Sequence, residues 1–153
     1  MTVILRRRSR PDELPIDLHG TDLSGARLEG ADFSGADLRN CVLRDARLNG
    51  CTLTEVKLNA SDCFGASFVD AVLPGAFLIK TILDHAALVD ADLQGAKLID
   101  ATLNEAVMQG AKLGGDLSGA DLDSAQMFSH TLSDEQRGQA RNASSVIFVD
   151  SES

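Results

Sequence analysis

The sequence repeats itself every five residues. A large apolar residue recurs at this spacing from Leu18 to Leu113, which gives twenty copies in one register, and Leu117, Leu122 and Met127 follow after one slip. Five residues turn a helix by about 500°, so a helix would scatter these side chains around its axis. An odd period would place them on alternate faces of a flat strand. The pattern therefore requires a chain that turns a corner once in every repeat.

Each repeat also has a second inward position and a turn position. The residue two places before the large apolar one is mostly Ala, and both point the same way if this stretch is extended. The last position is rich in Gly, Asn and Asp, as at Gly30, Asn40 and Asp45, which suits a tight turn. Coils stacked in this way pair backbone to backbone at about 4.8 Å.

Repeats such as residues 31–35 (ADFSG) and 36–40 (ADLRN) resemble the pentapeptide-repeat family, whose consensus is close to A-(D/N)-L-x-x. The resemblance covers residues 16–129. It implies an all-β fold, a right-handed four-sided β-helix with twenty residues in each coil. We therefore expect an N-terminal arm or cap at 1–15, the β-helix at 16–129, and a C-terminal helix and cap at 130–153.

The ends of such a stack need caps because they would otherwise expose unpaired backbone. Ser133 to Gln136 has the pattern of a capping box and predicts a short helix that continues to about Asn142. Residues 146–149 (VIFV) are expected to plug the last coil, and residues 3–5 (VIL) either begin the first coil or lie outside it.

Two irregularities and three cysteines stand out within the repeats. One residue, the expected Ala, is missing after Gly115, which predicts a kink or a tightened corner near Gly114–Asp116. Pro74 lacks an N–H and predicts a second local irregularity. The cysteines show no metal-like spacing and are interpreted as small core residues beside the Leu column. They are Cys41, Cys51 and Cys63.

The charge of the chain is acidic and uneven. Of the net charge of −9, residues 16–129 carry −9, while residues 1–15 carry +2 and residues 130–153 carry −2. Free nucleic acid is therefore not the expected ligand, because phosphate binding needs clustered Lys and Arg. The short apolar start at Met1–Leu5 does not form a signal-peptide core, and no run is long enough to span a bilayer. We expect a cytoplasmic protein.

A coil of twenty residues places outward residues twenty apart in columns, which gives a map of the surface. The map predicts two apolar patches on opposite sides of the rod, with further apolar residues between them and acidic residues around them. Such an arrangement suits a basic protein partner. The predicted partner-binding residues are Phe77, Ile79 and Ile99 on one side, Val69, Val89 and Val107 on the other, Phe64 and Ile82 between them, and the acidic Asp70, Asp84, Asp90, Asp100 and Glu105.

Catalytic and metal-binding motifs are not found in the sequence. The histidines His19, His85 and His130 do not share a column, so no metal site is expected. The glycines follow the repeat and form no phosphate-binding loop. A rod with a filled core offers no deep pocket of the kind that enzymes use. We therefore expect a protein without enzymatic activity and without a cofactor.

Three functions remain open. Members of the resembled family include acidic rods that are similar to B-DNA in width and charge, and that bind DNA gyrase and protect it from quinolone drugs. The preferred hypothesis is an immunity-type inhibitor of a basic nuclease toxin, which needs only a compact acidic and apolar face. The alternatives are a DNA mimic that protects gyrase or another type II topoisomerase, and a general interaction scaffold unrelated to DNA enzymes.

Overall fold

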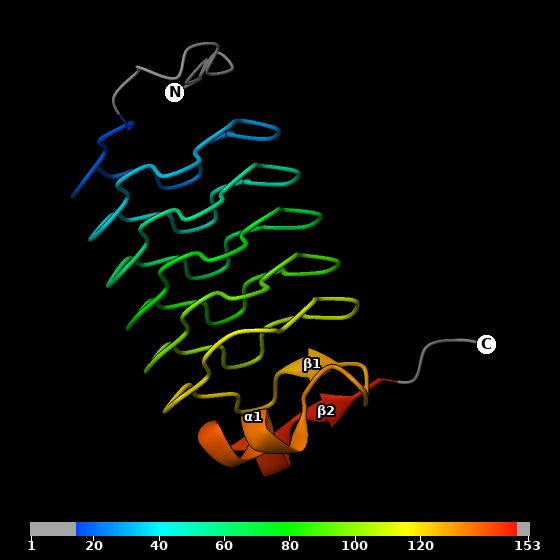
Figure 1. The fold of residues 1–153 in the computed structure, drawn as a ribbon. Helices are drawn as coiled ribbons and strands as arrows, with labels where there is room; N and C mark the ends of the chain where they lie inside the picture. The colour runs from blue at the N-terminus through cyan, green and yellow to red at the C-terminus, as the bar shows by residue number, and fades with distance from the viewer. Residues whose placement is uncertain (1–14, 150–153) are drawn as a thin grey trace.

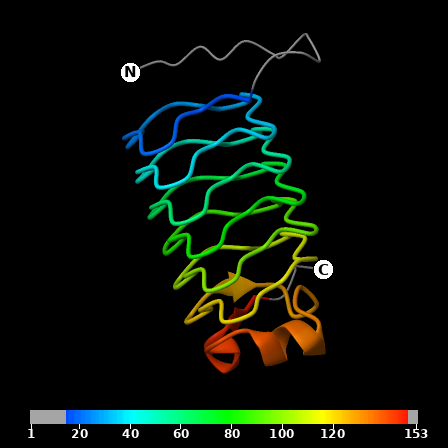
Figure 2. The same cartoon turned by 60° about the vertical axis from the view of Figure 1, so that its left-hand side comes forward.

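The chain forms a rod of stacked coils, shown from two sides in Figures 1 and 2, and the computed structural model describes residues 15–149. Parallel bridges join residues twenty apart on four faces. Face 1 begins with Asp17↔Asp37, face 2 with Asp22↔Val42, and face 3 with Arg27↔Arg47. Face 4 begins with Asp32↔Thr52. The twenty-residue, four-sided coil is therefore confirmed.

Each face is a short parallel ladder between neighbouring coils. On face 1, the Asp37 amide donates back to the Ile16 carbonyl at 2.8 Å, and the Leu38 amide donates forward to the Lys57 carbonyl at 2.8 Å. The corner after each face is closed by the backbone itself, as where the Ala46 amide donates to the Leu43 carbonyl at 3.0 Å. Because every face turns after so few residues, nearly all pairs are isolated bridges rather than strands.

The fifth residue of the repeat adopts the left-handed conformation, as the Gly, Asn and Asp pattern predicts. Its φ is +63° at Gly25 and +56° at both Asn40 and Asp45. A side chain that bonds locally makes this conformation accessible to Asn and Asp, whereas most other residues avoid it. The same conformation occurs at Ala60, Lys80 and Glu105, so the stacked coil imposes the corner even where the residue does not favour it.

The core is the column of large apolar residues with smaller residues beside them. Phe33, Phe68 and Leu58 have no exposed surface. Cys41, Cys51 and Cys63 are free and buried, which confirms their place in the core. Burial raises the pKa of the Cys51 thiol to about 11 and also raises the pKa of the other two thiols, so all three stay protonated near neutral pH.

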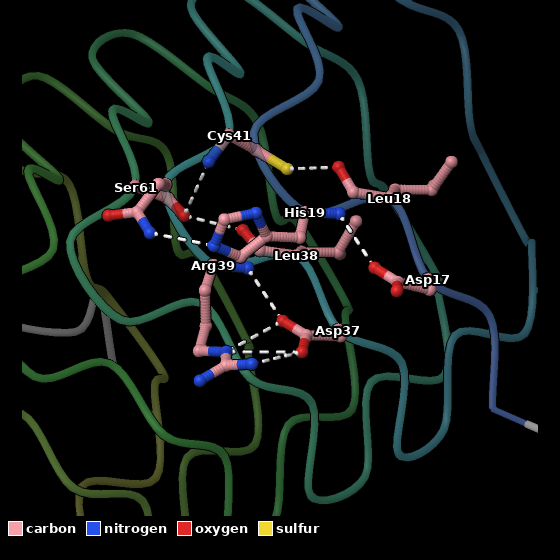
Figure 3. Close-up of polar contacts among 9 residues, drawn as sticks. Asp17, Leu18, His19, Asp37, Leu38, Arg39, Cys41 and Ser61 are labelled. Carbon is pink, nitrogen blue, oxygen red and sulfur yellow. Dashed lines mark hydrogen bonds and ion pairs between the residues drawn. The ribbon is translucent and has the colours of Figure 1, made fainter.

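Polar side chains enter the core only where they find a carbonyl. Ser61 Oγ donates to the Leu38 carbonyl at 2.6 Å, and Cys41 Sγ lies 3.1 Å from the Leu18 carbonyl oxygen (Figure 3). Thr81 Oγ1 donates to the carbonyl of Leu58 at 2.8 Å. Each of these residues replaces the small Ala and bonds to the coil before it, so its burial leaves no hydroxyl or thiol unpaired.

The missing residue changes the spacing of the coils from twenty to nineteen. The bridges that span the slip are nineteen residues apart, as between Lys97 and Asp116 and between Thr102 and Asp121, and the next one, between Asp121 and Arg141, is again twenty apart. The Asp116 amide donates across the coils to the Ala96 carbonyl at 3.0 Å, so it does not close the corner on Leu113. A tightened corner at Gly114–Asp116 was expected from the sequence, and the structure confirms it.

The C-terminal end covers the last coil (Figure 1). The helix α1, Asp134–Gln139, begins with the predicted capping box, in which Ser133 and Gln136 exchange side-chain and backbone hydrogen bonds. It ends at Gln139, before the predicted Asn142, because the chain there extends to continue the stack and the Arg141 amide donates to the Ala120 carbonyl at 2.7 Å. A 3-10 turn, Ala143–Ser145, follows.

The strands β1, Gln126–Met127, and β2, Ile147–Phe148, pair in parallel at this end. Val146 is buried and closes the core together with Leu132. The prediction that residues 146–149 as a whole plug the last coil was wrong, because Ile147 and Phe148 lie on the surface with 48% and 38% of their area exposed. Ile147 lies over the outward Gln126, which explains its exposure.

Pro74 causes no irregularity, and that prediction was also wrong. The coil around it keeps its bridge at Val72 and its ladder bond from the Glu55 amide to the Pro74 carbonyl at 3.0 Å. In other repeats this amide bonds to an aspartate two residues earlier, as from Arg39 to Asp37. The backbone N–H at this position of the repeat therefore does not belong to the ladder. Two residues before Pro74 stands Val72, whose side chain cannot accept a hydrogen bond, so the missing N–H of proline costs no bond.

The predicted role of residues 3–5 lies outside the described residues. Within residues 15–149, no helix has the length and apolar character needed to cross a membrane.

Candidate protein-binding surface

Face 1 carries the first predicted patch. Phe77 and Lys97 form a bridge, and Lys97 Nζ lies 5.0 Å from the centroid of the Phe77 ring. Ile79 and Ile99 follow on the same face in adjacent coils, but all three apolar side chains are half-buried. Asp100 lies at the corner toward face 2, with φ of +55°. The structure thus brings the patch together, although it leaves little of it exposed.

The charges of face 1 are balanced by local pairing. Arg39 binds Asp37 through its guanidinium, with Nη2 2.6 Å from Oδ2 (Figure 3). This pair lowers the pKa of the Asp37 carboxyl to about 2 and raises the pKa of the Arg39 guanidinium. Lys57 and Lys97 lie in the same column as Asp37. Face 1 therefore offers no strongly acidic surface.

Face 3 carries the second predicted patch. Val69, Val89 and Val107 lie on this face and are half-buried, and Asp70 and Asp90 occupy left-handed corner positions beside them. The column through Val107 and Gln126 continues to Ile147, which lengthens the apolar surface beyond the prediction.

Face 2 holds the two most exposed apolar residues among those predicted. Phe64 is 37% exposed and Ile82 is 38% exposed, and they come from adjacent coils. The Phe64 ring meets the His85 ring edge-on, with centroids 5.0 Å apart at 60°. His85 Nδ1 lies 3.4 Å from Glu105 Oε2. Asp84 accepts a hydrogen bond from the Asn104 amide at 2.9 Å, which fixes its carboxylate on this face.

Face 2 is also the acidic side of the rod. Its outward positions and its corner toward face 3 carry seven carboxylates, and only two lysine or arginine residues, Arg44 and Arg141, lie among them. Face 2 therefore combines the most exposed of the predicted apolar residues with the largest group of carboxylates among the four faces of the described chain. The carboxylates are Asp22, Asp45, Asp62, Asp84, Glu105, Asp121 and Asp123.

The sequence reasoning missed one exposed residue elsewhere and several members of this surface, namely Arg44 and the carboxylates Asp22, Asp45, Asp62, Asp121 and Asp123. Arg44 and Asp62 form an ion pair across neighbouring coils, with Nε 2.6 Å from Oδ2. Their positions in adjacent columns of face 2 were the available signal. Val72 is 40% exposed on face 4, where it fills an outward position that aspartate takes in many other repeats.

The structure offers hollows elsewhere, at the register slip. Two hollows of about 290 Å³ and 490 Å³ lie on either side of Leu113 and Gly114, and neither includes Phe64 or Ile82. Face 2 is thus a candidate for contact with a protein rather than with a small molecule. Within residues 15–149, no three His, Cys, Asp or Glu side chains are grouped so that they could hold a metal ion.

Comparison with known proteins agrees with this architecture. A family model described as pentapeptide repeats matches eight copies over residues 16–54, 61–98 and 86–125. Among solved structures, the chain is similar to Rfr23, a pentapeptide repeat protein from the cyanobacterium Cyanothece 51142. That likeness has a TM-score of 0.69 and 21% identity over 87% of this chain and 91% of that one.

A second similar structure is QnrB1, described as a plasmid-mediated fluoroquinolone resistance protein. The TM-score is 0.58 and the identity is 22%, over 83% of this chain and 68% of that one. At these identities the likenesses show a shared fold. Among curated proteins, none matches the chain in sequence.

Proposed function

The chain belongs to the pentapeptide repeat family, and from this premise we propose that it is a non-catalytic solenoid whose face 2 binds a basic, DNA-acting protein. The preferred form of the proposal is an immunity-type inhibitor that occupies the DNA site of a nuclease toxin. Fold alone does not assign this role, since one fold hosts many functions. The proposal therefore rests on the chemistry of the surface.

The observation that carries it is the combination of Phe64 and Ile82 with the carboxylates of face 2. Exposed apolar residues that adjoin one another usually mark a contact surface. A protein that binds DNA presents a basic surface to the phosphates, so an acidic face with an apolar centre is complementary to it. On faces 1 and 3 the predicted apolar residues are half-buried and the surroundings are less acidic, and the exposed Ile147 lies at the C-terminal end of face 3.

The first test is affinity capture of the tagged protein from its own cell lysate, at low and at high salt, with identification by mass spectrometry. A captured nuclease is then assayed for inhibition of DNA cleavage. Because QnrB1 is a fluoroquinolone resistance protein of similar fold, a type II topoisomerase assay is run beside it. Inhibition of DNA cleavage by the nuclease supports the preferred form of the proposal. If only the topoisomerase is affected, the partner is a type II topoisomerase and the nuclease form is wrong.

A matched pair of variants locates the surface. Ile82 and Val72 are β-branched, equally exposed, and occupy the same position of the repeat on faces 2 and 4. Ile82→Asn is expected to weaken binding about tenfold, as for the loss of a central apolar contact, while Val72→Asn leaves it unchanged. Asn is a consensus residue at this position, so both variants keep the fold. Equal effects of the two changes would contradict the assignment to face 2.

A further inference from the structure

Asp62 and Phe64 form a small platform on face 2. They are the two outward residues on either side of the buried Cys63. Asp62 Oδ1 accepts a hydrogen bond from the Phe64 amide at 3.2 Å, so the carboxylate is held next to the ring. The edge contact with His85 supports the ring from the following coil.

A guanidinium group already lies on this platform. Arg44 comes from the preceding coil, and its Nε is 2.6 Å from Asp62 Oδ2 while its Cζ is 5.6 Å from the centroid of the Phe64 ring. A carboxylate and an aromatic face are the two groups that proteins use together to bind arginine. The Arg44 side chain is 56% exposed, and among the described residues it makes no other polar contact.

We propose that Asp62 and Phe64 form a binding site for an arginine side chain of the partner protein, and that Arg44 fills this site in the free chain. The proposal rests on the proposed function, because it specifies how face 2 recognises a basic partner. On binding, the partner's arginine replaces Arg44, and Arg44 moves into solvent.

The exchange is physically easy because Arg44 is weakly held. Exposed ion pairs and exposed cation–π contacts contribute little in water. Once a partner covers the face, the same two contacts become shielded from solvent and therefore stronger. Arginine fits better than lysine, because its flat guanidinium can stack on the Phe64 ring while it donates to Asp62.

The test measures the binding of fluorescein-labelled deca-arginine and deca-lysine by fluorescence anisotropy at physiological salt. The wild-type protein is expected to bind deca-arginine more tightly than deca-lysine. Arg44→Gln removes the internal competitor and is expected to tighten deca-arginine binding roughly threefold to tenfold, the range of one exposed ion pair and one cation–π contact. The double variant Arg44→Gln with Phe64→Leu is expected to lose this gain.

Arg39→Gln is the matched control. It makes the same change in net charge and frees the carboxylate of Asp37 on face 1, where Arg39 makes no aromatic contact among the described residues. Long-range attraction of the cationic peptide rises equally in both variants. Only the excess of Arg44→Gln over Arg39→Gln therefore measures the site, and circular dichroism melting checks that every variant is folded.

The arginine site would be overturned if Arg44→Gln and Arg39→Gln increased the affinity for deca-arginine equally. It would also be overturned if Arg44→Gln increased the affinity for deca-lysine as much as that for deca-arginine. The outcome is separable from the proposed function. If Ile82→Asn weakens the binding of a captured partner and Arg44→Gln leaves that binding unchanged, face 2 remains the binding surface but the arginine site is absent. If no partner is captured, the peptide experiment still decides whether the site exists.

Discussion

The regular corners of the coils and the one short corner after Leu113 satisfy the same backbone carbonyl by different means. In a regular corner, the Ala96 amide donates to the Leu93 carbonyl at 3.1 Å. At the short corner, Gln136 of α1 donates its side-chain amide to the Leu113 carbonyl at 2.9 Å. The first solution needs only a backbone and a turn residue, so it can be repeated. The second depends on one side chain, so it occurs once.

Stability is also distributed differently in the regular coils and in the C-terminal cap. Every regular coil has a similar neighbour on each side, and its contribution resembles that of the others. The cap holds its residues by individual contacts, such as the hydrogen bond from Asn142 to Asp121 at 2.7 Å. Substitutions of the same chemical kind should therefore have different costs in the two regions.

The largest expected effect is the removal of a core leucine from a regular coil. Leu58→Ala should lower the free energy of unfolding by about 4 kcal/mol, because Leu58 is fully buried between coils that cannot collapse onto the cavity. Leu132→Ala in the cap should cost about 2 kcal/mol, since the surrounding loops can relax. Urea denaturation followed by circular dichroism measures the free energy of unfolding of both variants. Equal losses would show that the cap and the regular coils do not differ in this respect.

The next effect concerns the two glycines of the slip. A Cβ on Gly115 would lie 1.8 Å from the Ala96 carbonyl oxygen, whereas a Cβ on Gly114 would lie 3.4 Å from the nearest atom, Gln94 Cα. Gly115→Ala should therefore cost about 2–3 kcal/mol, because backbone must move, and Gly114→Ala less than about 1 kcal/mol. Thermal melting of the two variants measures both losses of stability. A loss in Gly115→Ala no larger than that in Gly114→Ala would show that the corner can widen.

Gln136→Met tests the side-chain solution directly. It removes the donor to the Leu113 carbonyl and the side-chain half of the capping box, the acceptor for the Ser133 amide, and should cost about 2 kcal/mol. The control in the regular region is Ser61→Ala, which removes a donor to the Leu38 carbonyl. That carbonyl keeps its bond from the Cys41 amide at 3.3 Å, so the cost should be about 1 kcal/mol. A larger loss in Ser61→Ala would reverse the interpretation.

The smallest effect is the pH dependence of surface carboxylates. Arg39 lowers the pKa of Asp37 to about 2, below its usual value of about 3.9, so this pair adds stability above about pH 4 and loses it as the pH falls toward 2. Asp37→Asn should remove no more than about 1 kcal/mol at pH 7, and the loss should shrink toward zero as the pH falls through the folded-state pKa of about 2.

Asp116, after the slip, provides the comparison. Its pKa is lowered mainly by the Ser118 hydroxyl, so its contribution has the same sign. Asp116→Asn should give a smaller change, since Lys97 acts on this carboxylate only at longer range and no ion pair to it is present within residues 15–149. Stability curves at several pH values test both variants, and an increase in stability of wild type at low pH would contradict the sign.

The regular part of the fold was predictable because one period determines every position. Twenty-residue arithmetic placed Phe77 over Lys97 and put Phe64 and Ile82 on the side between the two patches, as the structure shows. The repeat period gives the face on which a side chain lies, but not how much of that side chain is exposed. Neighbouring side chains cover much of Phe77 and Ile79, while Phe64 and Ile82 stay exposed.

The errors arose where hydrogen bonding, rather than periodicity, decides. The effect of Pro74 depends on which amides belong to the ladder, and a list of residues does not give this. The end of α1 at Gln139 and the exposure of Ile147 depend on how the last segment aligns with the coil before it. The pairing of Arg44 with Asp62 depends on side-chain geometry between coils.

The change from twenty-residue to nineteen-residue spacing restricts how a gene for such a rod can change in length. Duplication or deletion of twenty residues before Leu113 adds or removes one coil and leaves every later side chain on its own face. A change of five residues moves all later side chains to the next face, and between Phe64 and Asp84 it would separate Phe64 from the carboxylates of the following coils. Beyond Leu113 the short corner and α1 must be inherited together, because Gln136 fits that corner alone. Growth by whole turns, with a fixed terminus, is thus the path that preserves a binding face.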